Sequence, residues 1–437
     1  MPTPSLLIVP ARFKSGKLYS QIPTSGAGDF TVTRATNATR VNASGLIESV
    51  ASGIPRLDYF ASDGTVGCPA LLVEPSAQNL VFHSSDWTSN WSAGTASGTT
   101  VVTNSAISLA PDGTATANEI YPTSGNTNHV RTSNSTTAVT YASGTVYTQS
   151  AFFKAGIGVG IQVQLQGPAA RFTQSGYANF DLINGLVFVV SGTTADTNRA
   201  ARIENYGNGW YRCSYTATCT SAGTGVGFAA TLIAASGDTR LPSFSGTVTD
   251  YLLGWGAQLE TGLVATSYIP TTTAAVTRNA DVVSVSGAVS GSIGQLSGTI
   301  YAEVDVTNQS AVRTILTISD NSSTNRIRLR RTGATSCDIE RNVSGSSNAS
   351  MNITIPSSGI VKIAIGYSSA ASGFIAYVNG SQAAIIAAAT NTFSGQLSQI
   401  NLGANFDGSA QLNNRILDAA LYTTRLTNAE LAALTSL

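Results

Sequence analysis

Apolar and polar residues alternate with a period of two along most of the chain. The alternation is clear over residues 210–215, 300–306 and 361–367. A strand directs successive side chains to opposite faces, so this period places apolar residues toward a core and polar residues toward water. The pattern predicts half-buried β-strands over these ranges.

Turn signals separate the predicted strands at short intervals. The clearest is Asn184-Gly185, which lies between two apolar runs, and residues 206–209 and Asn379-Gly380 are further turns of the same kind. Asn-Gly favours the positive φ angles of a type I′ hairpin. Many short strands joined by such turns are typical of sandwiches and closed sheets, so the chain is predicted to be all-β.

One segment near the C-terminus departs from this pattern. Thr427 and Glu430 have the spacing of a capping box, in which the hydroxyl caps the third amide of a helix and the carboxylate reaches back to the cap. Leu431, Leu434 and Leu437 then fall on one helical face. We expect a single short helix from about residue 428 to residue 436, lying on a sheet.

The density of predicted strands divides the chain into three regions. Residues 1–78 contain only short apolar runs broken by Pro and Gly, too few to close a core alone. This N-terminal arm is therefore expected to pack on a second domain of the same chain or on a partner chain. Residues 79–278 suffice for one β-sandwich and end in a Thr-rich extended connector, and residues 279–437 are predicted to form a second sandwich that carries the terminal helix.

Composition removes several functional classes. The 437 residues carry 23 Lys and Arg against 23 Asp and Glu, and only 11% are charged, compared with about 25% in ordinary globular proteins. A net charge of zero argues against nucleic-acid binding, which requires a basic face. With 42% hydrophobic residues the chain is too apolar for a disordered protein. No apolar run approaches the ~18 residues of a membrane span, and residues 1–9 lack the basic start of a signal peptide, so neither feature is expected.

The four cysteines are expected to be free, buried thiols. They are Cys68, Cys213, Cys219 and Cys337, too few for a disulfide scaffold and without metal-site spacing. Cys213 and Cys219 lie in one predicted strand, which would hold them about 20 Å apart. A disulfide needs Cα atoms within about 7 Å, so this pair is not expected to form one.

The motifs of common catalytic sites are missing from the sequence. No serine has glycine at both −2 and +2, the pattern of a nucleophile elbow, and no Gly-Lys-Ser/Thr phosphate loop is present. The two histidines, His83 and His129, have no ligand-spaced partner nearby and are interpreted as structural. We therefore expect no catalytic residue, no cofactor and no enzymatic activity.

Carboxylate pairs keep one enzymatic alternative open. Glycoside cleavage needs two carboxylates about 5 to 9 Å apart, and the pairs Glu303/Asp305 and Asp338/Glu340 each share a strand face at about 7 Å. Three arginines alternate along one strand face; they are Arg326, Arg328 and Arg330. We expect them to pair with these acids across a sheet. An exposed arginine ladder that binds an anionic glycan is the alternative.

Two tryptophans and two carboxylates are candidate ligand contacts. Trp87 and Trp91 lie four residues apart in a polar, loop-like segment, where an exposed ring could stack on the apolar face of a sugar. Packing over the edge of the sandwich is the interpretation that we favour for both rings. Asp320 and Asp407 lie beside Asn, Ser and Gly and are weak candidates for holding calcium, because one acid in a loop is a poor ligand set.

Several segments resemble proteins displayed on tailed-phage particles. Those that are similar to an N-terminal module of phage surface proteins are residues 17–23, 28–42, 45–48, 54–59 and 68–75. Residues 255–262, 266–272 and 276–278 resemble the end of a jelly-roll domain similar to carbohydrate-binding modules. The segments that resemble the concanavalin-like LamG fold are residues 377–380, 400–403, 415–422 and 426–431.

This resemblance implies a virion protein of a bacteriophage or phage-like particle, such as a head fibre, spike or capsid decoration. Such a protein would be made in the host cytoplasm, anchor to capsid or tail proteins through its N-terminal arm, contact host-surface glycan and form a homotrimer. The family has no invariant catalytic residue that maps onto this sequence. A tail-fibre receptor-binding protein and a glycan-degrading depolymerase are the alternatives, and a bacterial adhesin is disfavoured by the missing secretion signal.

Overall fold

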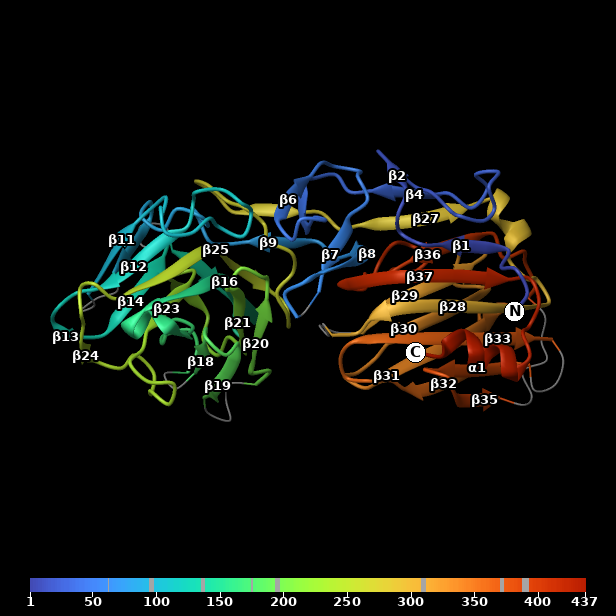
Figure 1. Cartoon of the computed structure of the whole chain (residues 1–437). Coiled ribbons are helices and arrows are strands. Elements are labelled where there is room, and N and C mark those ends of the chain that lie inside the picture. The colour runs from blue at the N-terminus through green and yellow to red at the C-terminus, as the bar shows by residue number, and fades with distance from the viewer. Residues whose placement is uncertain are drawn as a thin grey trace.

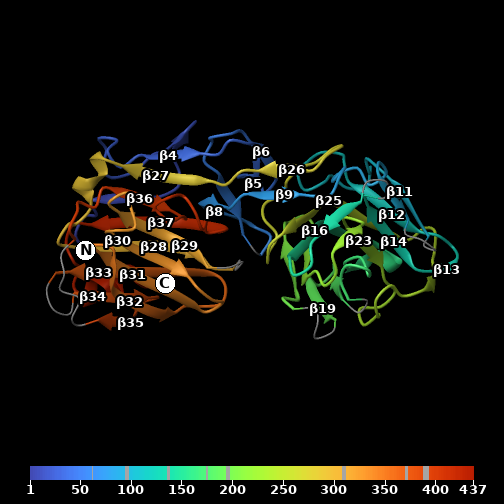
Figure 2. The same ribbon diagram turned by 180° about the vertical axis from the view of Figure 1, so that it is seen from behind.

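The computed structural model confirms the predicted all-β fold. Two β-sandwich lobes lie side by side, and the N-terminal strands run over the C-terminal lobe and reach the junction between the lobes (Figure 1, Figure 2). The structure describes residues 1–61, 63–93, 98–134, 138–173, 176–192, 197–307, 312–369, 373–386 and 393–437, with the exception of the side chain of Ile161.

The C-terminal lobe consists of two packed antiparallel sheets. The eight strands of the first sheet are β1 (Leu6–Ile8), β7 (Leu57–Phe60), β8 (Val66–Val73), β28 (Ser297–Asp305), β33 (Ile360–Ser368), β34 (Phe374–Val378), β35 (Ser381–Ile386) and β37 (Asn414–Tyr422). Their order is β35-β34-β33-β28-β37-β8-β7, and β1 also pairs with β37.

The nine strands of the second sheet are β2 (Phe13–Lys14), β3 (Lys17–Leu18), β4 (Phe30–Thr33), β27 (Val282–Ser286), β29 (Arg313–Ser319), β30 (Arg326–Arg331), β31 (Ser336–Val343), β32 (Ser346–Thr354) and β36 (Gln399–Leu402). Their order is β2-β3-β4-β27-β36-β29-β30-β31-β32, and the short 3₁₀ helix η2 (Ala288–Ser292) follows β27.

The N-terminal region supplies strands to both of these sheets. β1 and β8 pair with β37 in the first sheet, and β4 pairs with β27 in the second. The N-terminal side chains Leu6, Phe30, Val32, Leu57 and Val73 are buried in the same core as the strands of the C-terminal lobe. Of the two partners expected for the N-terminal arm, the structure therefore shows a domain of the same chain.

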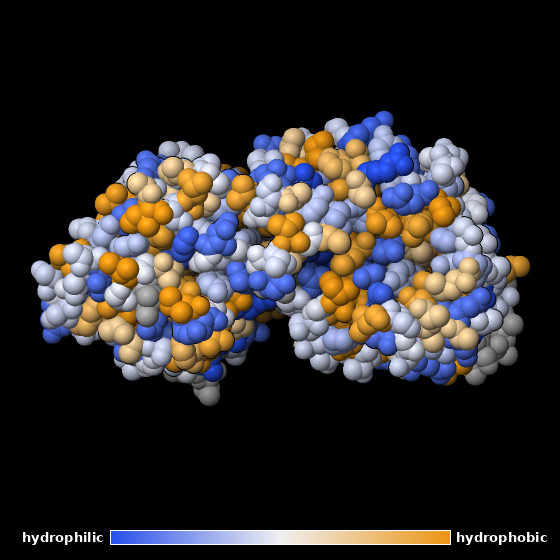
Figure 3. All heavy atoms as spheres, viewed as in Figure 1, coloured by the Kyte–Doolittle hydropathy of each residue, from blue (hydrophilic) through white to orange (hydrophobic). Residues whose placement is uncertain are grey.

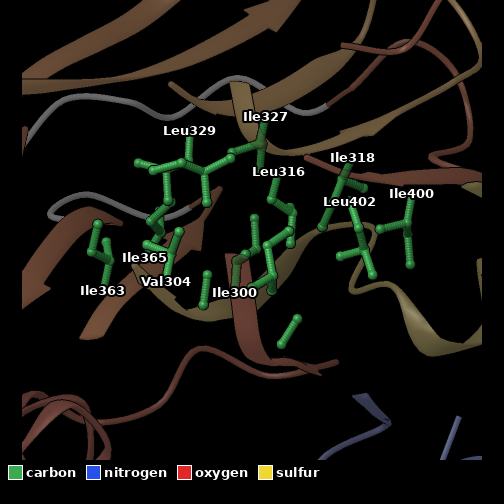
Figure 4. Close-up of a cluster of buried hydrophobic side chains, with 14 of the residues drawn as sticks. Ile300, Val304, Leu316, Ile318, Ile327, Leu329, Ile363, Ile365, Ile400 and Leu402 are labelled. Atoms are coloured by element: carbon green, nitrogen blue, oxygen red, sulfur yellow. The ribbon is translucent and has the colours of Figure 1, made fainter. Parts of the chain in front are cut away.

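The core of the C-terminal lobe lies between its two sheets (Figure 4). Alternate residues of β28 and β33 face this core, as the period over residues 300–306 and 361–367 predicts. The prediction that these strands are only half-buried is wrong for their middle, because Tyr301 and Ala364 are buried on the opposite face beside Leu431 of the C-terminal segment. It is also wrong for residues 210–215, where Arg212 and Ser214 are buried together with Cys213. The side chains that meet at the centre of this core are Ile300, Val304, Leu316, Ile318, Ile327, Leu329, Ile363, Ile365, Ile400 and Leu402. Burial of branched aliphatic side chains of this kind contributes about 1.5–3 kcal/mol each.

The other lobe, which precedes the C-terminal lobe in the chain and which we call the first lobe, is also a sandwich of two antiparallel sheets. The first contains, in order, β10 (Trp91–Ala93), β14 (His129–Ser133), β23 (Ala229–Leu232), β17 (Gln162–Leu165), β18 (Tyr177–Asp181) and β19 (Leu186–Ser191). The second contains, in order, β11 (Thr99–Val102), β12 (Asn118–Pro122), β25 (Tyr251–Thr261), β16 (Val146–Ile157), β21 (Trp210–Thr218) and β20 (Ala200–Asn205). The remaining elements are the pairs β13 (Asn126–Thr127) with β24 (Phe244–Ser245) and β15 (Val139–Tyr141) with β22 (Gly223–Gly225), and the 3₁₀ turn η1 (Gly158–Ile161).

All four cysteines are free thiols, and three of them are buried. Cys213, Cys219 and Cys337 lie inside the two lobes, as expected. The predicted burial is wrong for Cys68, which is exposed. It lies on the part of β8 that extends beyond the core, where the burial pattern changes from buried to exposed.

Two short strands carry the chain between the lobes. β9 (Ala77–Asn79) and β26 (Val276–Arg278) pair antiparallel, so the outgoing and returning connections run side by side. β5 (Ala38–Val41) and β6 (Ile47–Val50) form a hairpin near this junction. Ile47 of β6 is buried in one cluster with Trp210 and Trp255 of the other lobe, so the N-terminal region packs on both lobes.

Five buried charged side chains lie where the N-terminal region meets the two connections. This junction cluster consists of Arg34, Arg56, Glu74, Arg278 and Asp281, each at most 4% exposed. Arg34 and Arg56 both bind Asp281, and Glu74 binds Arg56 and Arg278 at 2.6 and 2.9 Å. Burial by itself would raise the pKa of Glu74, but the Arg278 and Arg56 guanidinium groups outweigh it and hold that pKa well below its usual range.

The predicted terminal helix is present as α1 (Asn428–Thr435). Its capping box is confirmed, because the Glu430 amide donates to Thr427 Oγ1 and the Thr427 amide donates to the Glu430 carboxylate at 2.8 Å. Leu431 is buried on the sheet, whereas Leu437 is 81% exposed, because the helix ends before that residue. Within the described ranges no helix has the length and apolar character needed to cross a bilayer.

The two clearest turn predictions have different outcomes. Asn379 and Gly380 have φ of 46° and 83° and join β34 directly to β35, as a type I′ hairpin requires. Of the pair Asn184-Gly185 only Gly185 has positive φ, at 66°. The Asp181 carboxylate accepts the amides of Ile183 and Asn184, which produces a longer turn instead of the predicted two-residue one.

Candidate functional site

The three predicted arginines share the outer face of β30. Arg326, Arg328 and Arg330 alternate with residues that face the core, and their side chains are 11%, 11% and 31% exposed. The alternation arises because successive residues of a strand point to opposite faces. Ile327 and Leu329 anchor the strand in the core and thereby fix the arginines on the outside.

Each arginine is paired with a carboxylate on β31. Arg326 and Arg328 both bind Glu340, and Arg330 binds Asp338 at 2.8 Å. The register of the two strands places Arg328 opposite Glu340 and Arg330 opposite Asp338. The predicted pairing of the arginines with acids across the sheet is confirmed, and both members of the carboxylate pair Asp338/Glu340 are engaged by guanidinium groups.

The loop between β36 and β37 covers one side of these ion pairs. Thr317 Oγ1 donates to the Ala404 carbonyl at 3.1 Å, and Gln399 donates to the Phe406 carbonyl at 3.1 Å. Arg328 reaches the side chain of Asn405 in the same loop. The loop therefore restricts access to this part of the face and leaves Arg330 as the most accessible of the three arginines.

These five paired side chains form what we call the arginine face, made of Arg326, Arg328, Arg330, Asp338 and Glu340. It presents fixed guanidinium donors beside carboxylate acceptors, with a surplus of one positive charge. Ser350 on β32 extends the polar strip by donating to Asp338 at 2.9 Å. Such an arrangement can exchange hydrogen bonds with hydroxyl or carboxylate groups of a ligand.

Trp87 and Trp91, the predicted aromatic ligand contacts, lie in the core of the first lobe. They are 0% and 5% exposed, and their rings stack at 4.7 Å with an interplanar angle of 9°. Phe153 and Phe228 pack against Trp87. A sugar would have to displace this core to reach either ring, so the packing interpretation describes both residues and the ligand contact is not available to them in this structure.

The carboxylates of Asp320 and Asp407, the two weak calcium candidates, accept hydrogen bonds from residues of their own loops. Asp320 accepts hydrogen bonds from Ser322 and Asn325 at 2.6 and 2.8 Å, and Asp407 accepts one from Ser409 at 2.6 Å. These bonds lower the pKa of Asp407, with the hydroxyl of Ser409 as the largest cause. Among the described residues no group of three or more His, Cys, Asp or Glu side chains is placed to hold a metal ion.

The two members of the other predicted carboxylate pair, Glu303 and Asp305, face different partners in the sheet. Asp305 binds Arg415 at 3.2 Å, whereas Glu303 lies directly opposite Asp418 of β37. Burial and the charge of Glu303 raise the pKa of Asp418 to about 6. Sequence reasoning missed Asp418, because it is more than a hundred positions from Glu303 and only the pairing of β28 with β37 brings them together.

Comparison with known proteins finds several that are similar to part of the chain. Three solved structures are similar over about a third of the chain. The carbohydrate-binding module CBM40 of the Ruminococcus gnavus IT-sialidase is 18% identical with a TM-score of 0.28, covering 33% of this chain and 84% of that one. The binding domain of botulinum neurotoxin DC is 13% identical with a TM-score of 0.29, covering 36% and 40%. A pentraxin from Limulus polyphemus is 11% identical with a TM-score of 0.25, covering 32% and 70%.

No curated protein sequence matches the chain significantly. The family match covers residues 277–432, which are nearly the whole C-terminal lobe apart from its N-terminal strands. These residues contain the core strands of both sheets, the arginine face and most of α1. Residues 277–432 match the family described as the concanavalin A-like lectin/glucanases superfamily.

Proposed function

We propose that this protein binds glycans through its C-terminal lobe and has a structural role, without an enzymatic one. The observation that carries the proposal is the match of residues 277–432 to the concanavalin A-like lectin/glucanases superfamily. The arginine face lies within those residues and offers a polar, preorganised surface on the outside of a sheet. Ion pairs held on a rigid sheet lose little side-chain entropy when they bind a ligand, which favours recognition of sugar hydroxyl groups.

A binding role without catalysis agrees with the state of the carboxylates on this face. A glycosidase needs one carboxylic acid and one carboxylate that can act on the substrate. Asp338 and Glu340 are both bound to arginines, so each carboxylate is already engaged by a partner on the neighbouring strand.

We place the protein on the surface of a virion, as a head fibre, spike or capsid decoration. The proposal rests on the resemblance of residues 17–75 and of the sandwich segments to phage surface proteins. Because the N-terminal strands are part of the C-terminal lobe, attachment to capsid or tail proteins would use the outer surface of that region and not a free arm. A tail-fibre location is the alternative, and a homotrimer is the proposed assembly. Peptide mapping and immunogold labelling of purified particles would test the location.

A depolymerase is the second candidate function, and one observation favours it. Asp418 lies opposite Glu303 and has a pKa raised to about 6, as a general acid requires. Tyr301 donates a hydrogen bond to Glu303 at 3.1 Å, which places an aromatic residue beside the pair. Loss of sugar release in an Asp418→Asn variant would establish this alternative.

One experiment separates binding from cleavage. The purified full chain is applied to a glycan array and to host-surface polysaccharides, and reducing ends released into the same wells are assayed. We expect binding without release. An Arg330→Ala variant should bind more weakly if the arginine face makes the contact, whereas Arg12→Ala, at an exposed arginine of the N-terminal region, serves as the matched control. Released oligosaccharide would overturn the non-enzymatic proposal, and the absence of any bound glycan would overturn the binding proposal.

A further inference from the structure

A cleft lies between the two lobes, and all three regions of the chain line it. Its volume is about 430 Å³, and the surface is indented at this position between the lobes (Figure 3). The N-terminal wall includes Phe60 and Cys68, the wall of the first lobe is the edge strand β20, and the C-terminal wall includes Ile360 and Leu417. β20 is the last strand of its sheet, and Asn205 at its end forms a β-bridge with Asp63 of the N-terminal wall.

The cleft continues in both directions. Arg202 and Thr307 also line a second hollow of about 370 Å³, which extends the cleft outward. Glu204 and Arg415 also line a third, small hollow of about 40 Å³, which lies inward beneath the β5–β6 hairpin and has room for a hydroxyl group but not for a sugar ring. The three hollows adjoin one another through these shared residues, and we refer to them together as the channel, with an open outer part and a small polar inner end.

The inner end contains buried polar groups that have no hydrogen-bond partner among the described residues. Arg212, Asn413 and Asn414 line it and are only 3%, 4% and 2% exposed. Arg212 Nε, Asn413 Oδ1 and Asn414 Nδ2 make no hydrogen bond to any residue that the structure describes. A buried donor or acceptor left without a partner is costly, so these groups favour a ligand that can both donate and accept hydrogen bonds. Hydroxyl groups do both.

The charges that line the channel are balanced. Among the described residues the three hollows are lined by five arginines and five carboxylates, which are Arg40, Arg202, Arg212, Arg331, Arg415, Asp58, Asp63, Glu74, Glu204 and Asp305. Several of these groups already neutralise one another, as in the pairs Arg415 with Asp58 and Arg202 with Glu204. An uncharged ligand therefore suits the channel better than an anion or a cation.

The outer part of the cleft adds apolar contact area. Ile203, Ile360 and Leu417 line it, and Ile360 is 39% exposed. A pyranose ring presents C–H groups on one face and hydroxyl groups at its rim, so it can bury its apolar face on such side chains while its hydroxyls reach polar ones. The combination of aliphatic side chains with fixed donors and acceptors is typical of small-molecule sites.

The walls of the cleft are held in place by structure already described. Arg415 binds Asp58 and Asp305 and lies over the Phe60 ring, 4.7 Å from its centroid. The buried junction cluster joins the N-terminal region to both connections between the lobes. A cleft fixed in this way binds a ligand without a large ordering cost.

We propose that the interlobe cleft is a binding site for an uncharged saccharide, with its hydroxyl groups at the inner end near Arg212, Asn413 and Asn414. This inference rests on the proposed glycan-binding function and names a site outside the arginine face. It predicts that both lobes and the N-terminal region contribute to one bound sugar chain.

The test uses the full chain and an array of neutral malto-, cello- and galacto-oligosaccharides of four to six units. Ile360→Trp would fill the cleft from an exposed position and should weaken binding about tenfold or more. Ile385→Trp is the matched control, because Ile385 is similarly exposed, at 46%, on β35 of the same lobe and does not line the cleft. Arg330→Ala reports on the arginine face in parallel.

Cys68 provides a second measurement on the unmodified protein. It is the exposed cysteine and lines the cleft, while the other three are buried, so a thiol reagent such as 5,5′-dithiobis(2-nitrobenzoate) labels it selectively. A saturating oligosaccharide from the array should slow this labelling about fivefold or more. The measurement stays decisive if the Ile360→Trp variant does not fold.

The outcomes separate the cleft from the proposed function. Weaker binding in Ile360→Trp but not in Ile385→Trp, together with protection of Cys68, supports the cleft. Neutral glycan binding with unchanged Cys68 labelling overturns the cleft, whatever the variants show, and leaves glycan binding in place. Binding of acidic glycans alone, sensitive to Arg330→Ala, likewise overturns the cleft and assigns the function to the arginine face. If the wild-type chain binds no glycan, the proposed function and the cleft both fail.

Discussion

Asp281 holds the buried junction cluster together, and its replacement by Asn is the sharpest test of how the chain is joined. The carboxylate binds Arg34 at 2.9 Å, contacts Arg56, and accepts the Glu74 amide at 3.0 Å. Asp281→Asn keeps the shape of the side chain but removes its charge. Three buried guanidinium groups then share the single carboxylate of Glu74.

The expected cost follows from the burial of these groups. Arg34 and Arg56 have no exposed side-chain surface, so solvent cannot compensate for the lost charge. Removal of one partner from a buried ion pair costs about 3–5 kcal/mol, because a buried charge is left without a partner. With a urea dependence of about 2 kcal/mol/M, the unfolding midpoint would fall by about 1.5–2.5 M.

The four tryptophans make it possible to observe the two lobes separately. All of them, at positions 87, 91, 210 and 255, belong to the first lobe, so fluorescence follows that lobe while far-UV circular dichroism follows both. We expect Asp281→Asn to lower the midpoint of the C-terminal lobe's unfolding transition, which is seen by circular dichroism but not by tryptophan fluorescence. Asp407→Asn, an exposed carboxylate of the C-terminal lobe, should change stability by less than about 1 kcal/mol. A loss below about 1 kcal/mol in Asp281→Asn as well would refute the assignment of the cluster as the joint.

Asp418→Asn is expected to stabilise the C-terminal lobe at neutral pH. Burial and the facing Glu303 raise the pKa of Asp418 to about 6 in the folded protein. The wild-type lobe therefore loses stability as pH rises from about 4 to 6, where the folded protein holds this proton more tightly than the unfolded chain does. The shift corresponds to about 3 kcal/mol, which partial exposure reduces to about 1–2 kcal/mol; thermal melts should show a larger gain at pH 7.5 than at pH 4.5. Trp87→Ala should cost about 3–5 kcal/mol in the fluorescence-detected transition, since it opens a cavity in the core. Thr427→Ala should cost about 1 kcal/mol by circular dichroism, because it removes the helix cap. A chain that starts at Asn79 should keep the fluorescence transition and lose the cooperative transition of the C-terminal lobe, because it lacks strands of both sheets.

The parts of the fold that depend on local pattern were predictable from the sequence. The strand alternation, the capped helix and the Asn379-Gly380 hairpin each depend on residues within ten positions of one another. The pairing of Arg326, Arg328 and Arg330 with acids also followed, because the strands β30 and β31 are neighbours in the chain. Where a side chain competed for the turn, as Asp181 does beside Asn184, the local signal was misleading.

The features that the sequence could not provide all depend on long-range pairing. The apolar runs of residues 1–78 are too short to indicate their own partners, yet Leu6 lies opposite Leu421 in the sheet. Trp87 and Trp91 lie in a polar segment, but that segment crosses the end of the sandwich and directs both rings inward. No local signal marks Asp418 or the interlobe cleft, because their neighbours are contributed by distant strands.

The interlobe cleft exists because the chain crosses the junction twice and returns to a lobe that it had already begun. The N-terminal strands belong to the core of the C-terminal lobe, so residues 57–73 can wall the cleft while β9 and β26 hold the first lobe beside them. A ligand in this cleft would touch Cys68, Ile203 and Ile360, which no single sandwich contains. Neither lobe expressed alone would retain the site. Binding there is therefore a property of the joined chain. The more stable the junction cluster is, the more of the cleft stays formed when one lobe is destabilised.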